Sequence, residues 1–220
     1  MINMSVTLMV GKLKKLEMAE PNADELAIFD RDFNTIVNHL RKIDSEIGDN
    51  FEVNRDFYRQ ALKIAKGYIE RPFGGLRPDS GQFGFTLLAP PDWNLTTYTF
   101  TVSAGWQDLI GSSGSPITAP TAATKMALFA WHSYVISGGP KPIYLRHTIN
   151  NYTYPIYSVY INSLLTKHGK PYKIIPLPGN IVIHPGGSFY LRAKFDTDGT
   201  IEFFPLGLVF AMYDYLAEEK

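Results

Sequence analysis

Residues 180–214 read NIVIHPGGSFYLRAKFDTDGTIEFFPLGLVFAMYD, and this stretch decides the fold class. From residue 188 to 195 apolar side chains alternate with polar ones, a period of two that places successive residues on opposite faces of a strand. Turns rich in glycine, at residues 185–187 and 196–199, separate this run from an apolar run on either side. The stretch predicts the terminal meander of an antiparallel sheet with one buried face, with a tight hairpin at Asp198-Gly199.

Working back from this stretch, residues 83–176 contain further short strand signals separated by turns. Residues 125–137 are apolar on both faces, which predicts a central strand, whereas residues 106–120 are rich in Gly, Ser and Pro and predict a long loop. The other predicted strands are 83–88, 95–104, 143–149, 154–165, 173–176 and 180–184. Roughly eight to ten short strands at such spacing are typical of a sandwich, jelly roll or barrel.

The N-terminal third has helical periodicity instead. Residues 22–47 predict one helix, because Asn22 and Glu25 have the spacing of a capping box and Gly48 supplies a stop. A second helix is predicted over residues 51–70. Apolar residues of the first helix recur about every 3.5 positions, the spacing of a coiled-coil seam. This seam either packs inside the chain or meets the same helix of another subunit, and its residues are Phe29, Phe33, Ile36, Leu40, Ile43 and Ile47.

These patterns divide the chain into three parts. Residues 1–71 form an N-terminal arm and a two-helix region, residues 72–82 a turn-rich linker, and residues 83–220 a β domain. The predicted fold class is therefore mainly β with N-terminal helices: an antiparallel β-sandwich, preferably a single jelly roll, preceded by two α-helices.

Composition excludes several classes of protein. The 21 basic residues balance the 21 acidic ones, and the only basic cluster is Lys12, Lys14 and Lys15, so no nucleic-acid partner is expected. The absence of cysteine rules out disulfides and thiolate metal sites. No apolar run reaches the ~18 residues that span a bilayer, and lysines follow the first apolar patch, the reverse of a signal peptide.

Motifs for chemistry are few. The spacing of Gly179, Pro185 and Gly187 resembles the first half of the second cupin motif, which implies a metal-binding histidine three residues later. Tyr190 stands there instead, and every histidine is isolated in sequence, whereas such a metal needs three or more converging ligands. His132 and His147 lie among apolar and aromatic residues and are predicted to be hydrogen-bonded core residues. No Walker loop, dinucleotide fingerprint or nucleophile elbow occurs, so we expect no cofactor.

The overall plan of helices followed by β strands over residues 81–214 resembles the virion structural proteins built on a single jelly roll, such as minor capsid and cement proteins. This resemblance implies a non-enzymatic subunit that associates with itself and with other shell proteins, located in the virion; without it, the absence of a signal peptide predicts a cytoplasmic protein.

Two alternatives to an assembly role stay open. One is a β-sandwich that binds carbohydrate or a receptor by aromatic stacking, with Trp106, Tyr152, Tyr154 and Tyr157 as its candidate residues. The other is a cupin-like enzyme.

Overall fold

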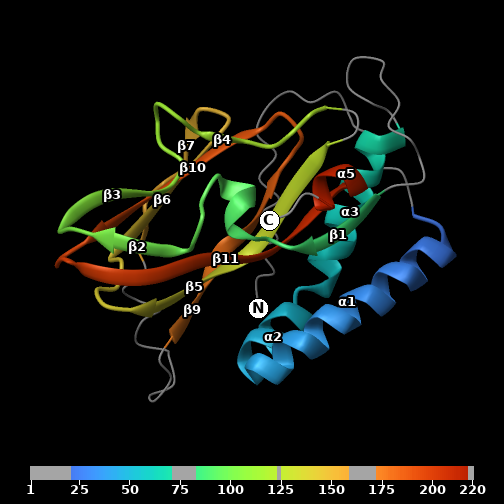
Figure 1. The fold of residues 1–220 in the computed structure, drawn as a ribbon, viewed down its shortest axis with the longest axis horizontal. Coiled ribbons are helices and arrows are strands. Elements are labelled where there is room, and N and C mark those ends of the chain that lie inside the picture. The colour runs from blue at the N-terminus through green and yellow to red at the C-terminus, as the bar shows by residue number, and fades with distance from the viewer. Residues whose placement is uncertain (1–20, 71–82, 123–124, 159–171, 218–220) are drawn as a thin grey trace.

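The computed structural model describes residues 21–70, 83–122, 125–158 and 172–217, and within them two antiparallel sheets form a sandwich (Figure 1). Sheet A consists of β1 (Phe83–Leu87), β2 (Thr99–Val102), β5 (Ala127–Gly138), β9 (Tyr172–Ile183) and β11 (Gly199–Met212). Sheet B consists of β3 (Gly105–Ile110), β4 (Ile117–Thr118), β6 (Tyr144–Ile149), β7 (Tyr152–Thr153), β8 (Tyr157–Ser158) and β10 (Ser188–Phe195). The predicted mainly β sandwich with N-terminal helices is confirmed.

Several of these strands are pieces of one interrupted edge strand. Sheet A has the order β1-β11-β5-β9, and β2 pairs with the same edge of β11 as β1 does, because β5 occupies the other edge. Sheet B has the order β3-β10-β6-β7; β4 likewise continues β3 along β10, and β8 continues β7 along β6. Each sheet therefore has four strand positions.

The meander predicted over residues 180–214 is wrong, although its strands are present. β9 and β11 belong to sheet A and β10 to sheet B, so the turn at 196–198 joins the two sheets and is no hairpin. The pattern itself explains this arrangement. β10 alternates buried and half-buried side chains because one face of sheet B is exposed, whereas β11 is buried on both faces from Pro205 to Met212. Strands with such different exposure belong to different layers.

The N-terminal segment forms three helices: α1 (Ala23–Ile43), α2 (Ser45–Glu52) and α3 (Arg55–Glu70). The predicted capping box is confirmed, since Asn22 and Glu25 bond each other's backbone N–H groups at 2.8 and 2.7 Å. The single helix predicted over 22–47 is wrong, because Asp44 is extended and its carboxylate caps α2 by accepting from the Glu46 N–H at 2.8 Å. Gly48 lies inside α2, where a Cβ atom would strike Arg41 of α1, so it serves packing and is no stop.

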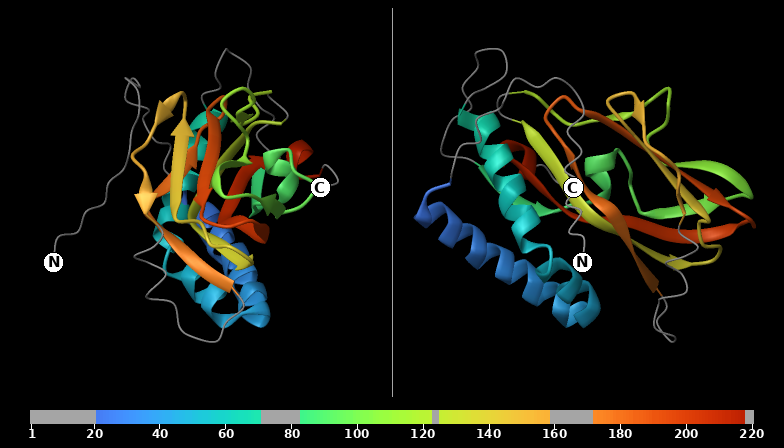
Figure 2. Two further views of the ribbon diagram at one scale, coloured as in Figure 1. Left: turned by 90° about the vertical axis from the view of Figure 1, so that its left-hand side faces the viewer. Right: turned by 180° about the vertical axis from the view of Figure 1, so that it is seen from behind.

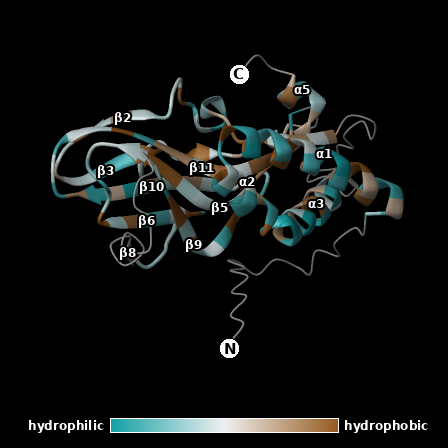
Figure 3. Cartoon of the chain, turned by 90° about the horizontal axis from the view of Figure 1, so that it is seen from below, coloured by the Kyte–Doolittle hydropathy of each residue, from teal (hydrophilic) through white to brown (hydrophobic). Residues whose placement is uncertain are grey.

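These helices cover the outer face of sheet A (Figures 1 and 2). β5 and β11 are rich in hydrophobic residues, and the side of the helices that faces away from the sheet is rich in hydrophilic ones (Figure 3). Ion pairs join α1 to α3 on the outside, between Asp30 and Arg59 at 2.8 Å and between Glu25 and Lys66 at 2.5 Å. The buried helix–sheet contact contains Phe29, Phe33, Val37, Leu40, Phe51, Tyr58, Ala61, Leu62, Ala65, Leu128, Ala130, Val135, Leu206, Leu208 and Phe210. None of the helices in the described ranges is long and apolar enough to cross a membrane.

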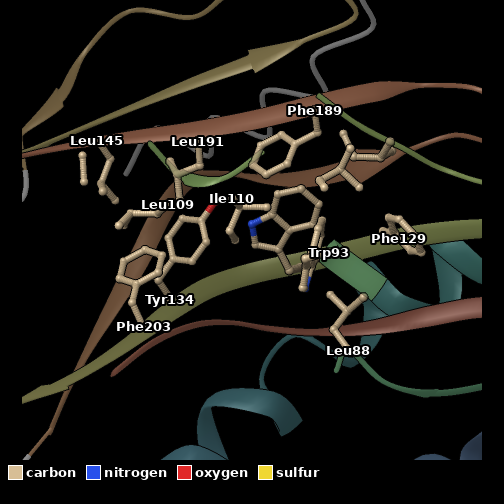
Figure 4. Close-up of a cluster of buried hydrophobic side chains, with 14 of the residues drawn as sticks. Leu88, Trp93, Leu109, Ile110, Phe129, Tyr134, Leu145, Phe189, Leu191 and Phe203 are labelled. Atoms are coloured by element: carbon tan, nitrogen blue, oxygen red, sulfur yellow. The ribbon is translucent and has the colours of Figure 1, made fainter. Parts of the chain in front are cut away.

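A second core fills the space between the two sheets (Figure 4). Trp93 lies at its centre, on the short helix η2 (Pro90–Trp93), with its ring 5.3 Å from that of Trp131 and 5.8 Å from that of Phe189. The short helix α5 (Tyr213–Leu216) closes one end, where the Tyr215 hydroxyl donates to the buried Asp92 carboxylate at 2.7 Å. The interior of the sandwich is therefore filled by large aromatic side chains.

Most of the other predicted strands are present in the structure. Residues 125–137 form the central strand β5, as predicted, and 83–88, 95–104 and 143–149 contain β1, β2 and β6. The loop predicted over 106–120 is wrong, because it contains most of β3 and all of β4; its turn residues, 111–116, are confined to the connection between them. The segments 173–176 and 180–184 join into one strand, β9. The N-terminal arm, the linker at 72–82 and most of 154–165 lie outside the described residues.

Gly207 marks the tightest backbone approach in sheet A, at a bulge where the β11–β5 register shifts. A Cβ atom there would lie 2.5 Å from Trp131 Cβ and 2.8 Å from Leu88 Cδ1, and closer still to the Ala130 carbonyl oxygen. We predict that Gly207→Ala lowers the free energy of unfolding by about 2 kcal/mol in urea denaturation. Gly114→Ala is the control, because a Cβ atom there meets nothing within 4 Å. Equal stabilities of the two variants would contradict this packing.

Candidate functional site

A buried polar network joins α2 and α3 to sheet A. Its origin is a bulge in β5: the ladders to β11 and β9 both skip His132, so His132 and the next residue, Ser133, reach the same helix side of the sheet. Asn50 Oδ1 of α2 lies 2.7 Å from His132 Nε2 and accepts from the Ser133 hydroxyl at 3.1 Å. Tyr58 of α3 lies with its hydroxyl 2.6 Å from His132 Nδ1.

The side chains of this network are uncharged. Because Asn50 Oδ1 only accepts, His132 Nε2 carries the proton and Nδ1 accepts from the Tyr58 hydroxyl. Burial lowers the pKa of His132 to about 3 and raises that of Tyr58. His132 is 3% exposed and Tyr58 fully buried, so neither side chain meets solvent. The prediction of a hydrogen-bonded core histidine is confirmed, and the network holds the helices on the sheet.

His147 of β6 occupies the equivalent role between the sheets. Its Nε2 lies 3.0 Å from the hydroxyl of Tyr134 in β5, and the two rings stack 5.7 Å apart. Burial lowers the pKa of His147 to about 4. This pair crosses the sandwich core and, like His132, confirms the prediction of a core histidine.

The outer face of sheet B presents a different set of side chains. β10 lies between β3 and β6, and its register places Arg192 between Asp108 and Arg146, and Lys194 between Trp106 and Tyr144. Cross-strand neighbours share one face of a sheet, so these residues form two adjacent rows on the solvent side. We call Trp106, Tyr144, Arg146, Arg192 and Lys194 the cation–aromatic face.

The cations of this face are arranged around aromatic rings. The Arg146 guanidinium lies 4.8 Å from the centre of the Trp106 ring, and that of Arg192 lies 5.9 Å from it. Lys194 Nζ lies 6.0 Å from the centre of the Tyr144 ring. Asp108 forms an ion pair with Arg192, 2.9 Å from Nε, without the alignment of a hydrogen bond. The Trp106 ring holds the nearer guanidinium, that of Arg146, in place and leaves its edge available to donate.

Sequence reasoning found only Trp106 in this group. The alternation in β10 places Arg192 and Lys194 on its polar face, but their meeting with Trp106 and Arg146 depends on pairings between strands far apart in the chain. The nearest signal was the alternation itself, and the long loop predicted over 106–120 concealed the strand that carries Trp106.

The other predicted stacking residues are not brought to Trp106. The centres of the Tyr152 and Tyr154 rings lie 4.9 Å apart. Tyr152 pairs with Ile149 of β6, and Ile149 is three residues from Arg146, so the side chains of Ile149 and Arg146 point to opposite faces of sheet B. The two tyrosines therefore lie on the other side of sheet B, roughly 15 Å along the strand. The Tyr157 backbone pairs with Leu145 in β8, and its side chain lies outside the described residues.

The predicted seam of α1 divides between buried and exposed positions. Phe29, Phe33 and Leu40 are buried against sheet A and the other helices of the same chain, whereas Ile43 is 68% exposed. Ile36 and Ile47 are half-buried against the same core. The packing inside the chain thus uses most of the seam, and a contact with a second subunit through the seam residues would rest on Ile43.

Side chains that could bind a metal ion do not cluster in the described residues. Within the described part of the chain, no three His, Cys, Asp or Glu side chains gather to hold a metal ion. The glycine turn after β9 that resembles a cupin motif contains His184, half-buried with its ring 5.5 Å from that of Tyr68. Comparison with protein-family models, curated proteins and solved structures gave no match to the chain.

Proposed function

We propose that this protein is a non-enzymatic structural subunit of the single jelly-roll class, a virion shell or shell-decorating protein that associates with itself and with other shell proteins. The observation that carries the proposal is the strand order. Sheet A places the β1/β2 position, β11, β5 and β9 side by side, and sheet B places the β3/β4 position, β10, β6 and the β7/β8 position. This order supports the proposed jelly roll, because two Greek keys of four strands each supply eight strand positions shared between two sheets.

Jelly rolls also occur in lectins and cupins, so the fold alone does not identify the function. The space between the two sheets distinguishes a cupin-like enzyme from a structural protein. A cupin-like enzyme would keep metal ligands and substrate space between its sheets. Here that space holds Trp93, Trp131, Tyr134, Phe189 and Phe203, each less than 2% exposed (Figure 4). Such packing supports a scaffold whose outer surfaces carry the function.

The outer surface of the helices offers the contact for assembly. Val53, at the end of α2, is 79% exposed and Ile43, at the end of α1, is 68% exposed, the two largest exposed fractions among the large apolar side chains of the described residues. Burial of such residues against a neighbouring subunit stabilises an oligomer.

This proposal predicts a defined oligomer of the full chain, measured as native mass by light scattering across a range of concentrations. Ile43→Ser combined with Val53→Ser should shift the mass toward the monomer, because the variant removes the apolar contact. The control is Ile156→Ser, which removes a 47% exposed apolar residue between β7 and β8 of sheet B. A monomer at every concentration would refute the assembly role. An oligomer indifferent to both helix substitutions would refute this contact.

Ligand recognition is the second candidate function, and the cation–aromatic face favours it. The Arg146 guanidinium lies over the Trp106 ring, which reduces the ring surface on which a neutral sugar could stack. The chemistry of the face points to a charged ligand.

A further inference from the structure

The two outer faces of the sandwich have different surroundings. The outer face of sheet A is apolar and lies under α1, α2 and α3. The outer face of sheet B carries the cation–aromatic face, and no described helix lies over it (Figure 1). Assembly through the helices would leave this face free for another task.

We propose that the cation–aromatic face binds an acidic polysaccharide, through sulfate or carboxylate groups held by Arg146, Arg192 and Lys194. The proposal goes beyond the assembly role and does not depend on it.

Charge is the first argument. Among the described residues of β3, β6 and β10, Arg146, Arg192 and Lys194 share this face with one carboxylate, that of Asp108, so this part of the surface is positive although the whole chain has no net charge. Asp108 pairs with Arg192, and Arg146 has no carboxylate partner among the described residues. An anion therefore meets cations that are only partly neutralised.

Preorganisation is the second argument. The Arg146 guanidinium lies over the indole of Trp106, where the ring restricts its motion at no cost to its hydrogen-bonding edge. A planar guanidinium edge matches the two oxygens of a carboxylate or sulfate group. The entropy cost of binding is reduced, because part of the side-chain ordering is already present.

The spread of the groups argues for a polymer with hydroxyl groups. The cations lie on two adjacent strands, ~5 Å apart, and on two successive rows, so repeated anionic groups on one chain satisfy them better than a single small anion does. Tyr144, at the edge of the patch, is 36% exposed and offers a ring to the apolar face of a sugar. Asp108 is half-exposed within the cationic row, where its carboxylate oxygens can accept hydrogen bonds from the hydroxyl groups of a sugar chain, which a polyphosphate or polyglutamate chain does not offer.

The test titrates the full chain with dextran sulfate and with polygalacturonate, using uncharged dextran as the blank. Trp106 is half-buried while Trp93 and Trp131 are buried, so a change in tryptophan fluorescence reports on this face. We expect saturable binding to at least one acidic polymer, weakened by salt, and none to dextran.

Variants then locate the site. Arg146→Gln should weaken binding about tenfold, and Arg146→Lys should recover part of the loss because it keeps the charge without the fork. Lys42→Gln is the matched control: it removes the same charge from the exposed side of α1 and should leave the affinity unchanged. Thermal unfolding of each variant confirms that it is folded.

Three outcomes would overturn the proposal. The first is the absence of binding to both acidic polymers at low salt. The second is an equal loss of affinity in Arg146→Gln and Lys42→Gln, which would indicate diffuse charge attraction. The third is tighter binding of polyglutamate or single-stranded DNA than of either polysaccharide, which would assign the face to another class of ligand.

Discussion

Replacing Phe33 by alanine is expected to lower the free energy of unfolding by about 3–5 kcal/mol. Phe33 is fully buried, with its ring 5.8 Å from that of Phe51, 5.7 Å from that of Tyr58 and 4.9 Å from the Arg55 guanidinium. One side chain thus contacts all three helices, and its removal leaves a cavity that the surrounding rings cannot fill without shifting.

The measurement is urea denaturation, with the midpoint compared at an unchanged slope. Ile43→Ala supplies the control from the same helix and the same sequence periodicity. Because Ile43 is 68% exposed, its truncation should change stability by less than about 0.5 kcal/mol in the monomer. Comparable losses in the two variants would contradict the placement of α1 on sheet A.

Acid is expected to destabilise the protein strongly between pH 6.5 and pH 3. Burial depresses the pKa of His132 to about 3 and that of His147 to about 4 in the folded chain. Above pH 6.5 both histidines are neutral in either state, so their contribution to stability is fully present. As the pH falls below 6.5, the two histidines bind protons in the unfolded chain but stay neutral in the folded chain. Stability is therefore lost until the pH reaches the pKa of each histidine in the folded chain. The loss is about 5 kcal/mol for His132 and about 3 kcal/mol for His147 once the pH is below the folded pKa of each.

The check is a series of urea denaturation curves from pH 7 to pH 4. His132→Gln should have a shallower pH dependence than the unmodified chain, even though it is less stable at pH 7 through loss of its bonds to Tyr58 and Asn50. Asn38→Gln, on the exposed side of α1, is the control, because it changes a side chain that does not titrate and should keep the pH dependence of the unmodified chain. If His132→Gln kept the full slope, the acid sensitivity would belong to other groups.

Local sequence patterns predicted where helices and strands lie better than they predicted which strands pair with one another. The apolar run of β5, the capping box at Asn22 and the core histidines follow from burial and hydrogen bonding that neighbouring residues determine. The break at Asp44 was missed because the apolar spacing continues from α1 into α2, while the chain turns at a capping aspartate.

Pairing between sheets was beyond local reasoning. A turn with Asp-Gly fits a hairpin, yet here it connects β10 in one sheet with β11 in the other. The informative signal was the contrast between an alternating strand and a strand apolar on both faces, which separates a sheet with one solvent face from a sheet between two layers. The cation–aromatic face was hidden for the same reason, since Trp106 and Arg146 are joined only through β10.

The cover that α1, α2 and α3 form over sheet A also bears on synthesis. The helices occupy residues 23–70, but β11, which supplies Leu206, Leu208 and Phe210 to their contact, spans residues 199–212. A nascent chain emerges from the ribosome with its helices first, and their apolar sides have no complete sheet to rest on until β11 follows. Long-range contacts of this kind slow folding, and the apolar sides of the helices stay without their partner strand until β11 has been synthesised.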